Sequence, residues 1–70
     1  MTVTLAAARV NKGLKQSEVA KFLDVHENIV TKWETGKCTP SLPNILKILD
    51  LYGLKFEEIE WGLENLENNN

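Results

Sequence analysis

The stretch that decides the fold is VHENIVTKWETG, residues Val25–Gly36. Its apolar side chains recur three and four positions apart, at Val25, Ile29, Val30 and Trp33. That spacing is typical of one face of a helix and not of the alternation of a strand. Gly36 stands where a glycine in the left-handed conformation commonly ends a helix. The stretch therefore predicts a helix with one face that packs inward and an opposite face that can contact a polar surface.

The residues before this stretch predict a second helix, joined to it by a short turn. Gln16–Leu23 (QSEVAKFL) carries Val19, Ala20 and Leu23 on one stripe. A small residue such as Ala20 lets two helices cross closely through a turn of about three or four residues. Asp24 occupies that turn, and aspartate adopts the left-handed backbone expected there more readily than most residues. We interpret the pair as a helix-turn-helix whose recognition helix follows the turn.

Two further helices are expected on either side of this pair. Thr2–Lys12 predicts a first helix that stops at Gly13. After a loop at Lys37–Pro40, Ser41 is expected to cap a fourth helix with a continuous apolar face, which ends at Gly53.

A fifth helix is expected near the end of the chain. Ile59, Leu63 and Leu66 recur there at helical spacing within an acidic segment. The predicted architecture is all-α, with five helices around one core in a single domain of residues 1–67. Residues 68–70 are expected to form a disordered polar tail.

The composition excludes several classes of protein. Seventy residues, 43% hydrophobic and 26% charged, suit one globular domain. One cysteine and one histidine allow neither an intrachain disulfide nor a zinc site, so we expect no metal and no cofactor. No signal peptide is apparent and the apolar runs are too short to cross a membrane, which favours a cytoplasmic protein. No nucleophile and base set, phosphate loop or paired-carboxylate cleft is discernible, so an enzyme is not expected.

The net charge of −2 hides an uneven distribution. Residues 1–55 hold all eight lysines and arginines against five acidic residues, a net charge of +3. Residues 56–70 hold five glutamates and no basic residue, a net charge of −5. A mildly basic body is compatible with phosphate binding, although two solvated faces would have the same composition.

Residues at about 5–60 resemble the lambda-repressor-like, Cro/Xre-type helix-turn-helix domain. The resemblance rests on five motifs in order and spacing: GLKQSEVA at 13–20, FLDV at 22–25, IVTKWETG at 29–36, GKCTPS at 36–41 and LPNILKILDLYGLKFEEI at 42–59. It implies that the third helix enters the major groove of double-stranded DNA, with its N-terminal half toward the base edges.

The base-reading residues that the resemblance implies are Glu27, Asn28, Thr31 and Lys32. Asn28 can both donate to and accept from an adenine edge, and Lys32 can reach guanine acceptors or a phosphate. Thr31 can meet a thymine methyl group or form a hydroxyl hydrogen bond. Glu27 can accept from a cytosine amino group, but it also repels phosphates, so it either narrows base preference or weakens DNA binding. A solvated helix face is the alternative for each residue.

Phosphate contacts are expected from two other places. Gln16 and Ser17 stand at the start of the second helix, where free backbone N–H groups and the helix dipole favour an anion. Lys37, Thr39 and Ser41 lie in the loop after the recognition helix and form the matching second clamp. Such contacts hold the register on DNA and set the salt dependence without carrying sequence information.

Two expectations concern the structure of the domain itself. Arg9 and Glu34 match positions that form an ion pair between the first and third helices of this family. Lys15, His26 and Lys55 stand at N-cap positions where Ser, Thr or Asp is usual, so these helix starts are expected to be less well capped.

The last segment carries more apolar surface than a five-helix monomer needs. We expect a contact between the subunits of a homodimer that binds a two-fold operator. Its members are Phe56, Trp61, Leu63 and Leu66. The alternative is that these residues close the domain's own core.

Three functions remain open at this point. The first is a sequence-specific DNA-binding transcriptional regulator, a repressor of bacterial or phage type. The second is the antitoxin of a toxin–antitoxin pair, whose acidic C-terminal segment holds a protein partner. The third is a helix-turn-helix retained as a protein-interaction module with little DNA binding.

Overall fold

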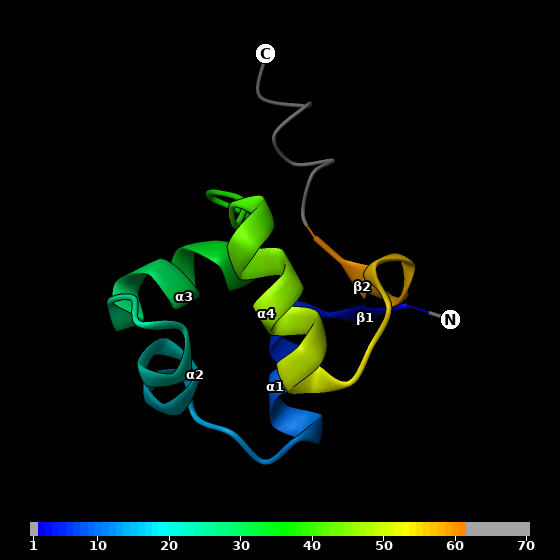
Figure 1. The fold of residues 1–70 in the computed structure, drawn as a ribbon, viewed down its shortest axis with the longest axis horizontal. Helices are drawn as coiled ribbons and strands as arrows, with labels where there is room; N and C mark the ends of the chain where they lie inside the picture. Colours follow the sequence, from blue (N-terminus) through cyan, green and yellow to red (C-terminus); the bar gives the residue numbers. More distant parts are fainter. Residues whose placement is uncertain (1, 62–70) are drawn as a thin grey trace.

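The computed structural model describes residues 2–61, and four α-helices make up most of this range (Figure 1). The helices are α1 (Leu5–Asn11), α2 (Gln16–Leu23), α3 (Glu27–Glu34) and α4 (Leu42–Tyr52). A 3-10 turn, η1 (Phe56–Glu58), follows α4. Two short strands, β1 (Val3–Thr4) and β2 (Ile59–Glu60), pair at the two ends of the described chain.

The prediction of a first helix over Thr2–Lys12 is too long at its N-terminal end. Val3 and Thr4 are extended as β1, and α1 begins at Leu5. Thr4 is the N-cap of α1, and its hydroxyl accepts a hydrogen bond from the backbone N–H of Ala7 at 3.0 Å. An N-cap residue has extended backbone angles, so Thr4 both starts the helix and belongs to the strand.

The prediction of five helices is wrong within the described residues, which contain four. Ile59, placed in a fifth helix by its spacing, lies in β2 and pairs in parallel with Val3. Its β-branched side chain suits the pleated, half-buried surface of a strand as well as a helix face, so spacing alone did not separate the two. Leu63 and Leu66, the other members of that pattern, lie outside the described residues.

The helix starts that lack a usual N-cap residue are satisfied in other ways. The backbone N–H of Lys15 donates to the carboxylate of Glu18 at 2.8 Å, and that of Lys55 donates to Glu58 at 2.8 Å. In each case the acceptor lies three residues along, which is one half of a capping box. His26 caps α3 directly, because its Nδ1 accepts from the backbone N–H of Asn28 at 3.2 Å.

The turn between α2 and α3 has the expected left-handed residue. Asp24 has φ 58° and ψ 46°, and it is the non-glycine residue with positive φ in residues 2–61. The backbone N–H of Val25 then donates to the carbonyl of Ala20 at 2.9 Å, which closes the end of α2 in a Schellman motif. Gly36, with φ 77°, ends α3 in the same way. These two ends fix where the helix-turn-helix starts its second helix and where that helix stops.

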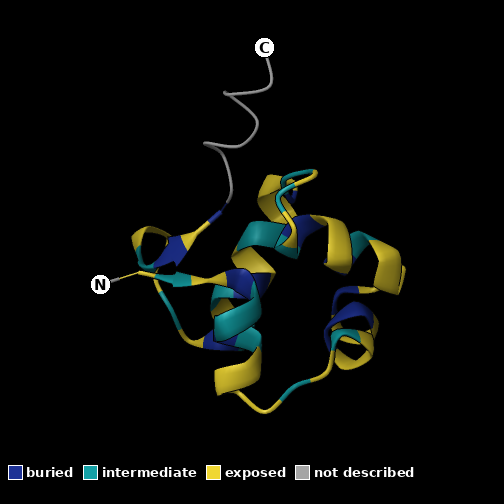
Figure 2. Cartoon of the chain, turned by 180° about the vertical axis from the view of Figure 1, so that it is seen from behind, coloured by how far each residue is buried: buried dark blue, intermediate teal, exposed yellow. Residues whose placement is uncertain are grey.

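The core lies where the four helices meet, and the buried parts of each ribbon face one another there (Figure 2). Its largest fully buried side chains are Ile48, Val19 and Val30. The other members are Leu5, Ala8, Ala20, Leu23, Trp33, Tyr52, Ile59 and Trp61. Both predicted helices of the helix-turn-helix contribute their apolar stripe to this core, so the two are held at a defined angle.

Candidate nucleic-acid interface

The candidate interface is the outer face of α3. Val30 and Trp33 on the inner face are buried, with 2% and 5% of their surface exposed. The four residues expected to read bases are all exposed: Glu27, Asn28, Thr31 and Lys32. Because the buried anchors alternate with them along one helix, the exposed side chains are presented on a rigid element.

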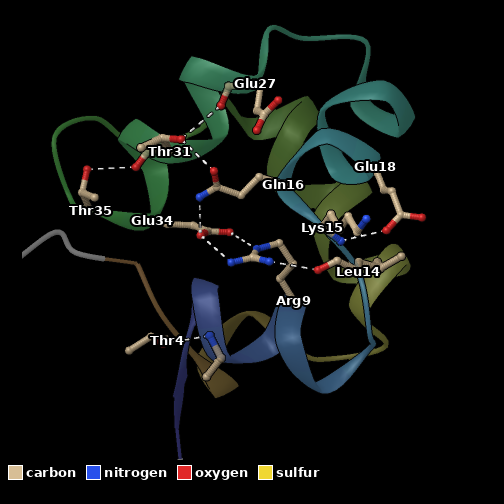
Figure 3. Close-up of polar contacts among 11 residues, drawn as sticks. Thr4, Arg9, Leu14, Lys15, Gln16, Glu18, Glu27, Thr31, Glu34 and Thr35 are labelled. Carbon is tan, nitrogen blue, oxygen red and sulfur yellow. Dashed lines mark hydrogen bonds and ion pairs between the residues drawn. The ribbon is translucent and has the colours of Figure 1, made fainter.

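Behind this face, Arg9 of α1 and Glu34 of α3 form an ion pair (Figure 3). Arg9 Nε lies 2.7 Å from Glu34 Oε2, and its Nη2 lies 3.3 Å from Glu34 Oε1. Arg9 Nη1 also donates to the carbonyl of Leu14 at 2.9 Å. Donation to Glu34 raises the pKa of Arg9 above its usual value. The side chains are 16% and 6% exposed, so the pair is largely withdrawn from water and joins the ends of two helices.

The carboxylate of Glu34 is also linked by hydrogen bonds to two of the predicted DNA-contact residues, Gln16 directly and Thr31 through Gln16. Gln16 Nε2, at the start of α2, donates to Glu34 Oε1 at 2.9 Å. The hydroxyl of Thr31 lies 3.0 Å from Gln16 Oε1 and 3.4 Å from the carbonyl of Glu27. The structure therefore brings together a predicted phosphate contact, a predicted base contact and the predicted ion pair in one hydrogen-bonded chain.

That chain is the part of the site that sequence reasoning missed. Arg9, Gln16, Thr31 and Glu34 were each singled out, but the bonds of Gln16 to the other two were not expected. The only sequence signal was that Thr31 and Glu34 stand three residues apart, and so share a helix face. Which side chain of α2 meets that face depends on the helix crossing, and periodicity within one helix does not reveal it.

Tyr52 of α4 lies near the ion pair and is buried, with 4% exposure. The pKa of its hydroxyl is raised to about 12, chiefly by burial and also by the negative charge of Glu34, while the positive charge of Arg9 opposes the rise. The ion pair behind the outer face of α3 therefore also affects the pKa of a residue on the fourth helix.

The residues expected to contact phosphate lie in two places, the start of α2 and the loop between α3 and α4. Gln16 and Ser17 form the first turn of α2, where backbone N–H groups are available to an anion. Lys37 and Ser41 are exposed after α3, and Ser41 is the N-cap of α4 without a side-chain capping bond. Thr39 differs, because its hydroxyl oxygen is buried and has no hydrogen-bond partner among the described residues. In this conformation that hydroxyl does not reach a phosphate.

Of the four predicted dimer residues, the structure buries one, exposes one and does not describe the other two. Trp61 is 6% exposed and belongs to the domain's own core, and its Nε1 donates to the carbonyl of Phe56 at 3.0 Å. Its ring stacks on that of Phe56, with centroids 5.2 Å apart. Trp61 is therefore a core residue and not a surface contact. Phe56 keeps 48% of its surface exposed, and Leu63 and Leu66 lie outside the described residues.

Residues 2–61 contain neither a metal-binding cluster nor a membrane-spanning helix. No group of three or more His, Cys, Asp or Glu side chains could hold a metal ion in that range. Among the helices described above, none has the length and apolar character needed to cross a membrane.

The comparison with known families agrees with the geometry. A sequence model of the helix-turn-helix family, of the Cro/C1 type, matches residues 5–59. Comparison with curated proteins and with solved structures gave no match. The matched range covers well over half of the 70 residues and includes α1 to α4 and the chain of hydrogen bonds from Arg9 to Thr31. The chain belongs to the Cro/C1-type helix-turn-helix family of DNA-binding regulatory domains.

Proposed function

We propose that this protein is a sequence-specific transcriptional regulator, a repressor of bacterial or phage type, which inserts α3 into the major groove and acts by occupying an operator. The observation that carries the proposal is the exposed polar face of α3, backed by the buried Val30 and Trp33. An α-helix fits the major groove, where each base pair presents a distinct set of donors, acceptors and methyl groups.

Base reading falls to side chains of complementary chemistry. The amide of Asn28 pairs with an adenine edge, and the ammonium of Lys32 pairs with guanine acceptors. The carboxylate of Glu27 accepts from a cytosine amino group. All three are exposed on α3, and Glu27 and Asn28 stand in its first turn, the part that approaches the bases in this family.

Phosphates on either side of the groove are bound by the start of α2 and by the loop after α3. Gln16 and Ser17 supply the first contact, and Lys37 and Ser41 supply the second. The hydrogen bonds of Gln16 to Glu34 and Thr31 support a phosphate contact at the start of α2, since they hold that start beside the outer face of α3.

Two copies bind as a homodimer to two half-sites about one turn of DNA apart, because a two-fold protein requires a two-fold operator. The exposed Phe56 supports a contact between subunits through the segment after α4. The expectation that Trp61 takes part is withdrawn, since the domain's own core covers it.

The test is selection of bound duplexes from a random library. The wild-type protein is expected to recover a two-fold motif, which also gives the half-site spacing. An Asn28→Ala, Lys32→Ala variant is expected to bind that motif at least about tenfold more weakly, because each lost base contact costs about 1–3 kcal/mol. The control is Asn11→Ala, Lys47→Ala, which removes the same residue types from exposed positions on α1 and α4. Equal binding by the two double variants would show that α3 does not read sequence.

A second candidate function is that of an antitoxin, which binds DNA and also holds a protein partner through its acidic end. It is favoured by the exposed Phe56, which is followed along the chain by the exposed acidic residues Glu57 and Glu60. Recovery of a motif by the selection, together with specific capture of a toxin encoded beside this chain, would favour this candidate over the repressor.

A further inference from the structure

The chemistry that Thr31 offers to DNA depends on where its single hydroxyl proton points. A threonine on a recognition helix can donate to a base acceptor, accept from a base amino group, or present its methyl group. Thr31 is exposed, but its hydroxyl is engaged within the protein. The ion pair of Arg9 and Glu34 fixes which group donates in each hydrogen bond from Glu34 through Gln16 to Thr31.

The carboxylate of Glu34 is paired with the guanidinium of Arg9, so it is ionised and can only accept hydrogen bonds. The group of Gln16 that faces Glu34, at 2.9 Å, must be its NH2, because the amide oxygen cannot donate. The amide oxygen of Gln16 then faces the other way, toward Thr31.

Because that oxygen only accepts, the 3.0 Å contact requires Thr31 to donate. The alternative acceptor for the same proton is the carbonyl of Glu27, at 3.4 Å, which is also within the protein. Either way the hydroxyl proton is not available to a base, so two roles toward DNA remain for Thr31: acceptance by the hydroxyl oxygen and apolar contact through the methyl group. Donation to a base would break the hydrogen bond from Thr31 to Gln16, whose orientation is fixed by Glu34. Contact through the methyl group leaves that bond intact.

We infer that Thr31 reads the 5-methyl group of a thymine, by apolar contact in the major groove, and that Glu34 and Gln16 are the positioning residues that commit its hydroxyl inward. The inference rests on the proposed function, since it assigns the base edge that one residue of α3 contacts. It selects one of the two roles that the sequence left open for Thr31.

The test uses the duplex recovered by selection, with each thymine of a half-site replaced in turn by deoxyuridine, which removes only the 5-methyl group. Binding is measured by fluorescence anisotropy at one fixed salt concentration. For the wild-type protein, one replacement per half-site is expected to weaken binding about fourfold, the factor for one buried methyl group.

Three variants identify the residue responsible. Thr31→Ser removes the methyl group and keeps the hydroxyl, and it is expected to bind thymine and deoxyuridine duplexes equally. Thr31→Val keeps a methyl group and loses the hydroxyl, and it is expected to retain the fourfold preference. Thr35→Ser is the matched control, because Thr35 is an exposed threonine at the C-cap of α3 whose hydroxyl also donates within the protein, to the carbonyl of Thr31 at 2.9 Å. It is expected to retain the preference as well.

If Thr31→Ser keeps the thymine preference and Thr31→Val binds both duplexes more weakly by the same factor, the inference is overturned and base contact is assigned to the hydroxyl. A motif in which no thymine shows a Thr31-dependent preference would also overturn it, and would leave the proposed function standing. A selection that returns no motif would overturn the proposed function and this inference together.

Discussion

The carboxylate of Glu34 accepts hydrogen bonds from two other helices, through Arg9 of α1 and Gln16 of α2. Glu34 of α3 is therefore bonded both to α1 and to Gln16, the proposed phosphate-contact residue at the start of α2. A buried carboxylate that loses its partners keeps the cost of its lost hydration, so such a residue is sensitive to changes nearby.

Arg9→Ala is expected to lower the free energy of unfolding by about 3–5 kcal/mol, because it leaves the nearly buried Glu34 with Gln16 as its remaining donor. Urea denaturation measures the change, with the exposed Lys21→Ala as the control, which is expected to shift stability by less than about 0.5 kcal/mol. If Arg9→Ala does not fold, Arg9→Lys gives a smaller loss of about 1–2 kcal/mol, because an ammonium cannot reach both Glu34 and Leu14 as the guanidinium does. Equal stability of Arg9→Ala and Lys21→Ala would contradict the structural role.

Tyr52 gives a dependence of stability on pH. Its pKa is about 12 when folded and 10.0 in an ordinary environment, mainly because the folded protein buries it. The unfolded chain therefore loses the proton first, so the contribution is fully present below pH 10 and is lost as the pH rises toward 12. The loss amounts to about 2–3 kcal/mol at most. Urea denaturation at pH 9, 10 and 11 is expected to show a steeper fall for wild type than for Tyr52→Phe. Parallel curves for the two proteins would remove Tyr52 as the cause.

At the scale of elements, the helix-turn-helix was the most predictable part of the chain. The apolar stripes of α2 and α3, the small Ala20 at their crossing and the left-handed Asp24 were all read from local spacing, and the structure has each of them. Local patterns report local structure, and both helices are long enough to show their period. The pairing of β1 with β2 left no such signal, because each strand has two residues and its partner lies at the other end of the sequence.

The turn between α2 and α3 gives a test at this scale. Asp24→Gly is expected to raise stability by about 0.5–1 kcal/mol, because glycine adopts φ 58° without the steric cost that a Cβ atom adds. Asp24→Asn is the control for the lost charge, since asparagine also tolerates this conformation, and it is expected to change stability by a few tenths of a kcal/mol. Thermal melting compares the three proteins. A Asp24→Gly variant no more stable than Asp24→Asn would mean that the turn carries no strain.

For the whole molecule, the exposure of the candidate residues on α3 was predictable, whereas the hydrogen bonds that connect them to other helices were not. The exposed face of α3 followed from helical period, whereas the buried hydroxyl of Thr39 and the inward Trp61 depend on how distant segments pack. The 3-10 turn and β2 replace a continuous helix after α4 and turn Trp61 toward the core. Tertiary packing therefore decided which apolar residues were left for assembly.

Association through Phe56 is the prediction at this scale. Sedimentation at rising concentration is expected to show a dimer, and Phe56→Ser is expected to weaken it, because Phe56 is half exposed beside the stacked Trp61. Phe22→Ser is the matched control, since Phe22 on α2 is exposed to a similar degree, 53% against 48%. A strict monomer at ~1 mM, which corresponds to an association free energy weaker than about 4 kcal/mol, would exclude a stable dimer in the absence of DNA.

The parallel pairing of β1 with β2 has a practical consequence for handling the protein. It places residues 3 and 59 side by side, and Figure 1 and Figure 2 both show these strands on the side of the molecule away from α3. A fluorophore or surface linker placed at Thr2 would therefore emerge on the side opposite the reading helix. Immobilisation through that position is compatible with single-molecule binding assays in which duplexes approach α3 from solution.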